Sequence, residues 1–382
     1  MNLLFDFMTL RVHSGAGEYV RRVYHALVKA LEEDGVKDVK LYGLYDSSRG
    51  IAYGDIREGE VELLDAHGGE LDKIVREKRI DRVFIGCAQY WGKIKGLRKI
   101  RCEVFCVVHD LGYEETACNK VNIFAHLDDR AIPSLYYAAK RYLRKNTALD
   151  LMKPFVSLSR SNPGFRFITV SEYSRASLQY NYGIDPELVT VLYSPEREVA
   201  PAARISNPTL RQVVEKGLPY DLLINADKPM KNAGKAVRVF GKFVERHKDR
   251  YIVTVGEIRR SVPNQIVLPF LSESDLEAAY RNCHAMIYPS FLEGFGYPPL
   301  EAMKFGKPIL CSNVCSMPEI LGDAPIYFSP LYETAIFKAL CSLDEGNYAE
   351  YSRKSRERYR VVHERQEQDL GKLVRALTDG SS

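Results

Sequence analysis

Two glutamates, Glu293 and Glu301, lie eight residues apart in the stretch YPSFLEGFGYPPLEAM, with two glycines and a pair of prolines between them. Because proline is tolerated only in the first turn of a helix, one continuous helix through both glutamates is excluded. The spacing therefore predicts a loop that carries Glu293, followed by a helix that is opened by the prolines, carries Glu301 and ends at Gly306.

This loop and helix directly follow the apolar run at residues 285–289, which is expected to be a strand. The loop after a strand of an open α/β sheet is a common place for ligands, and the free N–H groups at a helix start favour phosphate. From the residues alone, two interpretations stay open. Either both carboxylates contact a ligand, or Glu301 complements the helix dipole and Glu293 is a solvated loop charge.

Strands and helices alternate along the chain. Apolar, β-rich runs predict strands at residues 2–8, 40–45, 82–86, 103–110, 165–170, 187–195, 220–226, 251–256, 265–270, 284–290 and 307–312. Helical patterns lie between them at residues 18–35, 172–183, 234–247 and 275–283, and a last one covers 348–377. The alternation predicts an α/β protein with parallel sheets and helices on both faces.

The proline- and charge-rich residues 195–217 interrupt this alternation, so we expect them to link two domains. The predicted organisation is an N-terminal domain over 1–198, a C-terminal domain over 199–350, and a helix over 351–382 that packs back toward the N-terminal domain. Both domains are expected to be doubly wound and Rossmann-like, and to face each other across a ligand-binding cleft.

Capping residues locate two of the predicted helix starts. Ser171 is expected to cap the helix over 172–183, and Ser274 is expected to form a capping box with Glu277. A glycine-containing loop over residues 9–17 is expected to join the first strand to the helix that begins at Glu18.

The composition describes a globular protein large enough for two cores: 382 residues, 46% apolar and 27% charged. The net charge of +4 suits an anionic small ligand or a membrane surface and is too small to indicate a nucleic-acid partner. The eight cysteines show no C-x-x-C pair, which favours reduced thiols, a cytoplasmic location and no metal site. Neither a secretion signal nor an apolar run of about 18 residues is evident.

Residues 289–324, PSFLEGFGYPPLEAMKFGKPILCSNVCSMPEILGDA, resemble the C-terminal signature of the retaining GT-B glycosyltransferases of group 1, often called GT4. The two glutamates match the E-x7-E motif of that family. Five other blocks occur in the family's order: GAGEYVRRVYHAL, VVHDL, ITVSEYSRASL, ELVTVLYSP and KPMKN. The resemblance covers nearly all of the chain outside residues 113–165 and implies a GT-B fold.

The resemblance implies that a sugar is transferred, with retention of configuration, from a UDP- or GDP-sugar to a glycan or lipid-linked acceptor in surface polysaccharide or glycoconjugate synthesis. It implies catalytic roles for His109, Glu293 and Lys231. The implied donor-binding residues are Gly15, Gly17, Asn225, Lys228, Lys231, Asn232, Glu293, Gly294, Phe295, Gly296 and Glu301.

Each implied role is chemically reasonable. Glu301 would accept hydrogen bonds from the ribose, and Glu293 would hold the sugar hydroxyls. Lys231 would stabilise the departing diphosphate, although a lysine before a helix can also be a solvated charge. Backbone N–H groups at Gly294–Gly296 would reach the sugar or the phosphate, because glycine permits close approach.

The chain departs from the family pattern before Lys231. Relatives commonly carry Gly-Arg there, whereas this sequence has Asn225, Ala226, Asp227 and Lys228. Lys228 can replace the arginine as a point charge but cannot bind phosphate in the bidentate manner of a guanidinium group.

In the N-terminal half, Gly15 and Gly17 match the family's glycine loop, or they form a simple tight turn. His109, at the end of a strand, corresponds to the family histidine near sugar and acceptor, although a histidine in this position can also be structural. Asp110 beside it would orient the imidazole or cap the next element.

The resemblance implies no metal or other cofactor besides the nucleotide-sugar donor. Three other functions stay open: a sugar-nucleotide epimerase, a glycosidic phosphorylase of the same fold, or a non-catalytic partner of a transferase. Residues 130–145 form an amphipathic basic pattern, which predicts either peripheral contact with the inner face of a membrane or a core-packed helix with cations at its end.

Overall fold

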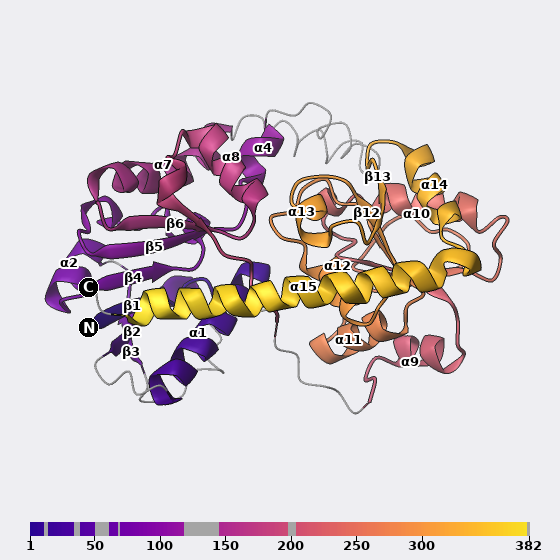
Figure 1. Cartoon of the computed structure of the whole chain (residues 1–382), viewed down its shortest axis with the longest axis horizontal. Helices are drawn as coiled ribbons and strands as arrows, with labels where there is room; N and C mark the ends of the chain where they lie inside the picture. Colours follow the sequence, from indigo (N-terminus) through magenta and orange to yellow (C-terminus); the bar gives the residue numbers. More distant parts are fainter. Residues whose placement is uncertain are drawn as a thin grey trace. The chain divides into compact units, whose positions relative to one another are not determined.

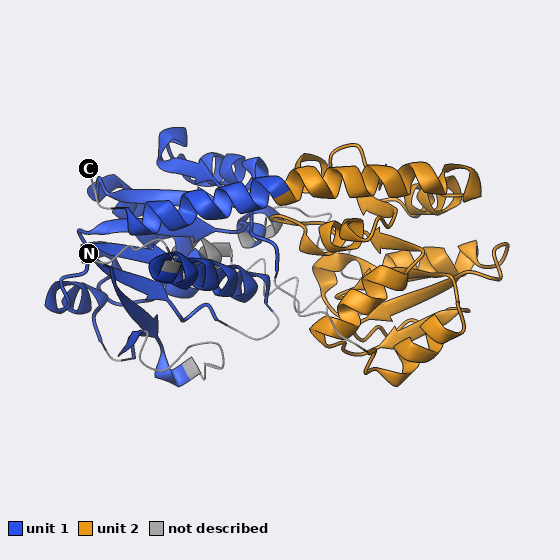
Figure 2. Ribbon diagram, turned by 60° about the horizontal axis from the view of Figure 1, so that its bottom comes forward, with its two compact units in different colours: residues 1–115, 144–197, 364–382 blue, residues 116–143, 198–363 orange. Residues whose placement is uncertain are grey.

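A computed structural model describes residues 1–10, 14–33, 39–49, 61–67, 69–117, 145–197 and 204–379. The chain divides into two compact units (Figure 2). Unit 1 comprises Met1–Glu115, Arg144–Arg197 and Glu364–Ser382, and unit 2 comprises Thr116–Leu143 and Glu198–His363. The amphipathic pattern predicted over residues 130–145 lies outside the described residues.

The described part of unit 1 forms a seven-stranded parallel sheet in the order β3-β2-β1-β4-β5-β6-β7 (Figure 1). Its strands are β1 (Asn2–Asp6), β2 (Lys40–Tyr45), β3 (Glu62–Asp65), β4 (Arg82–Ile85), β5 (Glu103–Val108), β6 (Phe165–Thr169) and β7 (Val189–Val191). The order reverses beside β1, which pairs with β2 on one side and β4 on the other. This is a doubly wound sheet, whose ligands bind beyond the carboxyl ends of the strands.

Both faces of the unit 1 sheet are covered by helices: α1 (Gly15–Glu33), α2 (Leu71–Glu77), α3 (Ala88–Trp91), α4 (Gly112–Ala117), α7 (Lys145–Ser161) and α8 (Glu172–Tyr182). Leu3, Leu4 and Phe5 of β1 are all fully buried, as expected for a strand packed on both faces. Trp91 of α3 and Phe155 of α7 pack into the same core. The continuous apolar runs of the strands thus reflect burial on both sides.

The described part of unit 2 forms a six-stranded parallel sheet in the order β10-β9-β8-β11-β12-β13 (Figure 1). Its strands are β8 (Tyr220–Ile224), β9 (Tyr251–Val255), β10 (Gln265–Leu268), β11 (Ala285–Tyr288), β12 (Ile309–Ser312) and β13 (Ile326–Phe328). The helices are α9 (Pro208–Glu215), α10 (Ala233–Phe243), α11 (Glu273–Asn282), α12 (Tyr297–Lys304), α13 (Met317–Leu321), α14 (Glu333–Ser342) and α15 (Glu345–Thr378). The predicted α/β class with two doubly wound sheets is confirmed.

Several local predictions are confirmed. The Ser171 side chain caps α8 by accepting a hydrogen bond from Ser174 N at 3.1 Å. Helix α12 begins at Tyr297 with proline in its first positions and stops before Gly306, whose φ of +66° is the left-handed conformation typical of a helix end.

Two local predictions are wrong. The expected linker over residues 195–217 contains helix α9, which Asn207 caps by accepting a hydrogen bond from Leu210 N at 3.0 Å. The capping box expected at Ser274 is also absent, because α11 begins two residues earlier than expected, at Glu273, and Ser272 caps it by accepting a hydrogen bond from Asp275 N at 3.2 Å.

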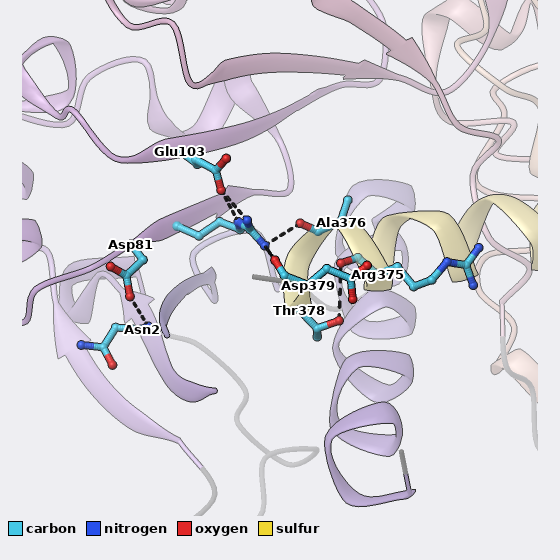
Figure 3. Close-up of polar contacts among 8 residues, drawn as sticks. Asn2, Asp81, Glu103, Arg375, Ala376, Thr378 and Asp379 are labelled. Carbon is cyan, nitrogen blue, oxygen red and sulfur yellow. Dashed lines mark hydrogen bonds and ion pairs between the residues drawn. The ribbon is translucent and has the colours of Figure 1, made fainter. Parts of the chain in front are cut away.

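Helix α15 starts in unit 2, and its residues from Glu364 onward belong to unit 1. At its end, the Arg82 guanidinium donates to the carbonyls of Ala376 at 2.8 Å and Asp379 at 2.9 Å, and also binds Glu103 (Figure 3). Seven residues before Ala376, the buried Asp369 carboxylate accepts a hydrogen bond from Tyr193 N at 3.0 Å. These contacts attach the end of α15 to the unit 1 sheet.

Among the helices that the structure describes, none combines the length and the apolar character that crossing a bilayer requires.

Candidate functional site

The loops after β8 and β11 lie side by side at the carboxyl edge of the unit 2 sheet, because these two strands are paired in parallel. Asn225 follows β8 with a φ of +55°, and its carbonyl accepts a hydrogen bond from Lys228 N at 3.0 Å. Phe291 N then donates to Met230 O at 2.9 Å, which joins the two loops. The backbone thereby brings together two segments that the sequence analysis singled out separately.

Lys231 and Glu293 form an ion pair at this edge. Lys231 Nζ also donates to the Tyr288 hydroxyl at 2.7 Å, and it lies 4.9 Å from the centre of the Tyr288 ring. The side chains of Lys231 and Glu293 are only 16% and 11% exposed. Two of the three predicted catalytic residues are thus in direct contact and largely removed from bulk water.

Tyr288 was not predicted from the sequence. It ends strand β11 and is buried, and that burial, followed by the neighbouring Glu293 carboxylate, raises the pKa of its hydroxyl well above the usual value. The hydroxyl therefore stays protonated at neutral pH and can serve as a fixed hydrogen-bonding partner. Its only sequence signal is its place as the last residue of the strand before the Glu293 loop.

The end of β12 and the segment after it support the backbone of the Glu293 loop. Ser312 Oγ donates to Ser290 O at 2.7 Å, and Ser316 Oγ donates to Glu293 O at 3.0 Å. Between them, Cys315 has a φ of +53°, a left-handed conformation that is uncommon for a residue with a side chain. The SNVCS segment thus fixes the loop without taking part in the ion pair.

The glycines of the loop have a steric role as well. Gly296 has a φ of +95°, a conformation that residues with a side chain rarely adopt, and this favours glycine before α12. Phe295 is buried and stacks edge-on against Tyr297 at 5.5 Å, so its side chain belongs to the packing and only its backbone is available to a ligand. Gly294 lies on the same loop, and Glu301 is partly buried in the second turn of α12.

The other two predicted residues beside Lys231 differ in character. Lys228 lies three residues before Lys231 on the same loop, and desolvation, followed by repulsion from Lys231, lowers the pKa of its ammonium group. Asn232 is buried at the start of α10 with a φ of +53°, and its amide nitrogen donates to Pro289 O at 3.3 Å and Pro330 O at 3.1 Å. Its amide therefore ties two loops together.

In unit 1, His109 follows strand β5, and its Nε2 lies 2.9 Å from Gly86 O. A carbonyl only accepts hydrogen bonds, so the neutral ring carries its proton on Nε2 and has Nδ1 as an acceptor. Burial lowers the pKa of the imidazole, which keeps it neutral at pH 7. The Tyr19 ring packs edge-on against it at 4.9 Å. His109 is thus a neutral hydrogen-bond acceptor.

Asp6 fixes the backbone of Gly86, whose carbonyl contacts His109. This fully buried carboxylate at the end of β1 accepts hydrogen bonds from Gly86 N at 2.9 Å and from Thr9 N at 3.0 Å. Burial raises the pKa of Asp6. Asp6 was not predicted from the sequence, where its only signal is a lone acidic residue within an apolar strand.

Asp110 was expected either to orient the imidazole or to cap the next element, and it acts as a cap. Its carboxylate accepts a hydrogen bond from Gly112 N at 2.9 Å at the start of α4, whereas the Gly86 carbonyl contacts the imidazole ring.

The glycine-containing loop was predicted to extend over residues 9–17, and the predicted end of this loop is wrong. Helix α1 already begins at Gly15, so Gly15 and Gly17 lie in its first turn. Ser14 satisfies the helix start, because its hydroxyl accepts a hydrogen bond from Gly17 N at 3.0 Å. The two glycines permit close approach to the N-terminal end of a helix, where free N–H groups favour anions.

Residues 211–330, which contain the Lys231–Glu293 pair, match the family described as glycosyl transferases group 1. The chain carries a group 1 glycosyltransferase domain. The family that the sequence motifs predicted is thereby confirmed, and the matched residues include both loops of the unit 2 edge.

Solved structures of glycosyltransferases show the same fold over the whole chain. Sucrose-phosphate synthase from Thermosynechococcus elongatus has a TM-score of 0.70 at 15% identity, with 100% of both chains covered. WaaG, a glycosyltransferase of lipopolysaccharide biosynthesis, has a TM-score of 0.62 at 15% identity over 99% of this chain and 100% of its own. Anabaena HepE, solved with UDP and glucose, reaches 0.64 at 14% identity, with 100% of both chains covered. The predicted GT-B fold is confirmed.

Curated relatives are similar to this chain over shorter stretches. O-antigen chain mannosyltransferase B from Escherichia coli is 30% identical over 43% of this chain and 47% of its own. O-antigen chain mannosyltransferase RfbU from Salmonella typhimurium is 26% identical over 47% of this chain and 50% of its own. The chain thus spans about half the length of these relatives.

Proposed function

We propose that this protein is a retaining mannosyltransferase that moves a mannosyl residue from a nucleotide diphosphate mannose to a glycan or lipid-linked acceptor in surface polysaccharide synthesis. The names of its relatives in Escherichia coli and Salmonella typhimurium, both O-antigen mannosyltransferases, support the sugar and the product class. The observation that carries the proposal is the Lys231–Glu293 pair beside Tyr288, at the sheet edge where such folds bind ligands.

Unit 2 supplies the groups that a nucleotide sugar requires. Lys231 stabilises the negative charge that develops on the departing diphosphate, and Lys228 adds a second cation where relatives have an arginine. Glu293 accepts hydrogen bonds from sugar hydroxyls and Glu301 from the ribose, since each carboxylate can accept from two donors at once. Of the UDP- and GDP-sugars expected from the sequence, GDP-mannose is the donor to test first.

Unit 1 supplies His109, whose Nδ1 accepts a hydrogen bond from a hydroxyl of the sugar or of the acceptor. In the transfer, the bond between the sugar C1 and the diphosphate oxygen breaks, and an acceptor oxygen forms its bond to C1 on the same face. The acceptor proton passes to the departing diphosphate oxygen, so that atoms and charge balance without a covalent enzyme intermediate.

The test is transfer from GDP-mannose to octyl α-D-mannopyranoside, followed by proton NMR of the product. We expect an α-mannosidic linkage and release of GDP, both abolished in Glu293→Ala. A β-linkage would contradict retention. Isomerised sugar nucleotide in the absence of acceptor would indicate an epimerase instead, and cleavage of the product that requires phosphate would indicate a phosphorylase.

A further inference from the structure

The cation and the carboxylate that the proposed function assigns to two different parts of the donor are bonded to each other in this structure. Lys231 contacts Glu293 and the Tyr288 hydroxyl, and an ammonium group has three N–H donors. Two of these donors are used, so one remains for a diphosphate, but the negative charges of the diphosphate repel the Glu293 carboxylate and compete with it for the same ammonium group.

Loss of its partner is costly for Glu293. Its side chain is only 11% exposed, so water cannot fully replace the lysine, and a buried charge left unpaired is strongly unfavourable. The hydroxyls of a sugar on the diphosphate are hydrogen-bond donors that a carboxylate can accept. A nucleoside diphosphate without a sugar brings no such donors.

We infer that Lys231 and Glu293 exchange partners when the donor binds, and that this exchange makes the site select sugar nucleotides over nucleoside diphosphates. Lys231 passes from Glu293 to the diphosphate, and Glu293 passes from Lys231 to the sugar hydroxyls. A ligand that completes only the first half leaves the carboxylate without a cationic partner. The inference rests on the proposed function and adds a means of releasing the nucleoside diphosphate product once the sugar has left.

Tyr288 is the positioning residue of this exchange. Its hydroxyl is held by a buried strand end and contacts Lys231 at 2.7 Å. This contact can persist while the lysine changes its anionic partner. The hydroxyl also interacts with the Glu293 carboxylate, so Tyr288 interacts with both members of the exchanging pair.

The experiment is calorimetric titration of wild-type protein and Glu293→Gln with GDP-mannose and with the methyl ester of GDP at its terminal phosphate. The two ligands carry the same charge, and only the first has sugar hydroxyls, so a general electrostatic change affects both alike. UDP-glucose and the methyl ester of UDP are titrated in parallel, so that the choice of base does not decide the outcome.

In Glu293→Gln the neutral amide has no charge to leave unpaired, so we expect the methyl ester to bind about tenfold more tightly than to wild type. The sugar nucleotide should gain nothing, because the amide is a poorer acceptor for its hydroxyls. The preference for sugar nucleotide over methyl ester should therefore fall by about tenfold or more. The matched control is Glu350→Gln, which removes the carboxylate of an exposed lysine pair on α15 and should leave both affinities unchanged.

Tyr288→Phe should weaken the binding of both ligands, because Lys231 loses the hydroxyl that positions it. An equal change of both ligands in Glu293→Gln overturns the exchange and leaves the proposed function standing. If wild-type protein binds no nucleotide ligand of either base, the proposed function itself fails, and the exchange fails with it.

Discussion

The carboxyl edges of the two sheets hold their chemically active side chains in different ways. In unit 2, Lys231 and Glu293 bind each other, and each can exchange its partner for part of a ligand. In unit 1, His109 is held by a backbone carbonyl, and that backbone is held by the buried Asp6 carboxylate.

The difference indicates which edge can adapt to a ligand. An ion pair between side chains can open when a competing charge arrives, and it returns when the ligand leaves. A ring bonded to a backbone carbonyl keeps one tautomer and one orientation. Unit 2 is thus suited to bind and release an anion, and unit 1 to present one fixed acceptor atom.

Removal of the exchangeable cation should have the largest effect. In Lys231→Met, we expect kcat for mannosyl transfer to fall by about 10²–10³-fold, because the charge on the departing diphosphate loses its stabilising partner. Steady-state kinetics with GDP-mannose measure this loss. Lys242→Met, at a largely exposed lysine of α10, is the control. Equal losses in the two variants would show that Lys231 has no special role.

Disturbance of the rigid edge should lower stability. In Gly86→Ala, the added Cβ would lie 2.1 Å from Val20 Cγ2, and such overpacking typically costs about 1–3 kcal/mol of the free energy of unfolding. Urea denaturation measures the change. The control is Gly69→Ala, where the nearest atom would be at an ordinary 3.6 Å. If Gly86→Ala were as stable as this control, the backbone around His109 would be more adaptable than we infer.

The neutral imidazole should appear in the pH dependence of stability. Burial lowers the pKa of His109 in the folded protein. Its contribution to the free energy of unfolding is therefore fully present above the pKa of an unfolded histidine, about 6.5, and is lost as the pH falls through the pKa of the folded state. Asp6 acts in the opposite sense, because burial raises its pKa and its contribution is lost as the pH rises.

We therefore expect that lowering the pH from about 7.5 to well below the ordinary histidine pKa of about 6.5 reduces the free energy of unfolding less in His109→Gln than in wild type. Urea denaturation at both pH values measures the difference. His67→Gln, at a side chain that is 64% exposed, is the control and should behave as wild type. An unchanged slope in His109→Gln would mean that the ring is not held neutral.

The smallest effect is expected from chelation. Since Lys231 and Lys228 provide positive charge at the unit 2 edge, we propose that transfer needs no divalent ion, and EDTA should leave the initial rate unchanged. The rate is measured with EDTA and again after addition of excess magnesium chloride. A rate lost with EDTA and restored by magnesium would show that the two lysines are not enough.

Elements with strong local signals could be predicted from the sequence. The prolines and glycines around α12 specify a helix start and stop by their own backbone preferences, so the loop and helix that carry Glu293 and Glu301 were found correctly. Buried parallel strands were found for a similar reason, because continuous apolar runs have few other structures available.

The errors came from local signals that fit two structures. Pro208 was interpreted as part of a linker, but proline also fits the first turn of a helix, and Asn207 before it caps α9. Gly15 and Gly17 were interpreted as a loop, although a capped helix tolerates glycine in its first turn.

The missed residues depend on contacts between distant segments. The Asp6 carboxylate meets Gly86 N from 80 positions away, and Tyr288 meets Lys231 across 57 positions. Their importance follows from what they touch, and a single sequence does not display such contacts.

The path of α15 has a consequence for protein synthesis. Residues 364–379 belong to unit 1, yet the ribosome makes them only after all of the described residues of unit 2. Until they emerge, the Arg82 guanidinium lacks the Ala376 and Asp379 carbonyls, and Tyr193 N lacks the Asp369 carboxylate. Unit 1, whose first residues are translated first, is therefore completed last. During synthesis, the surface of unit 1 that contacts the end of α15 stays uncovered until residues 364–379 have been made.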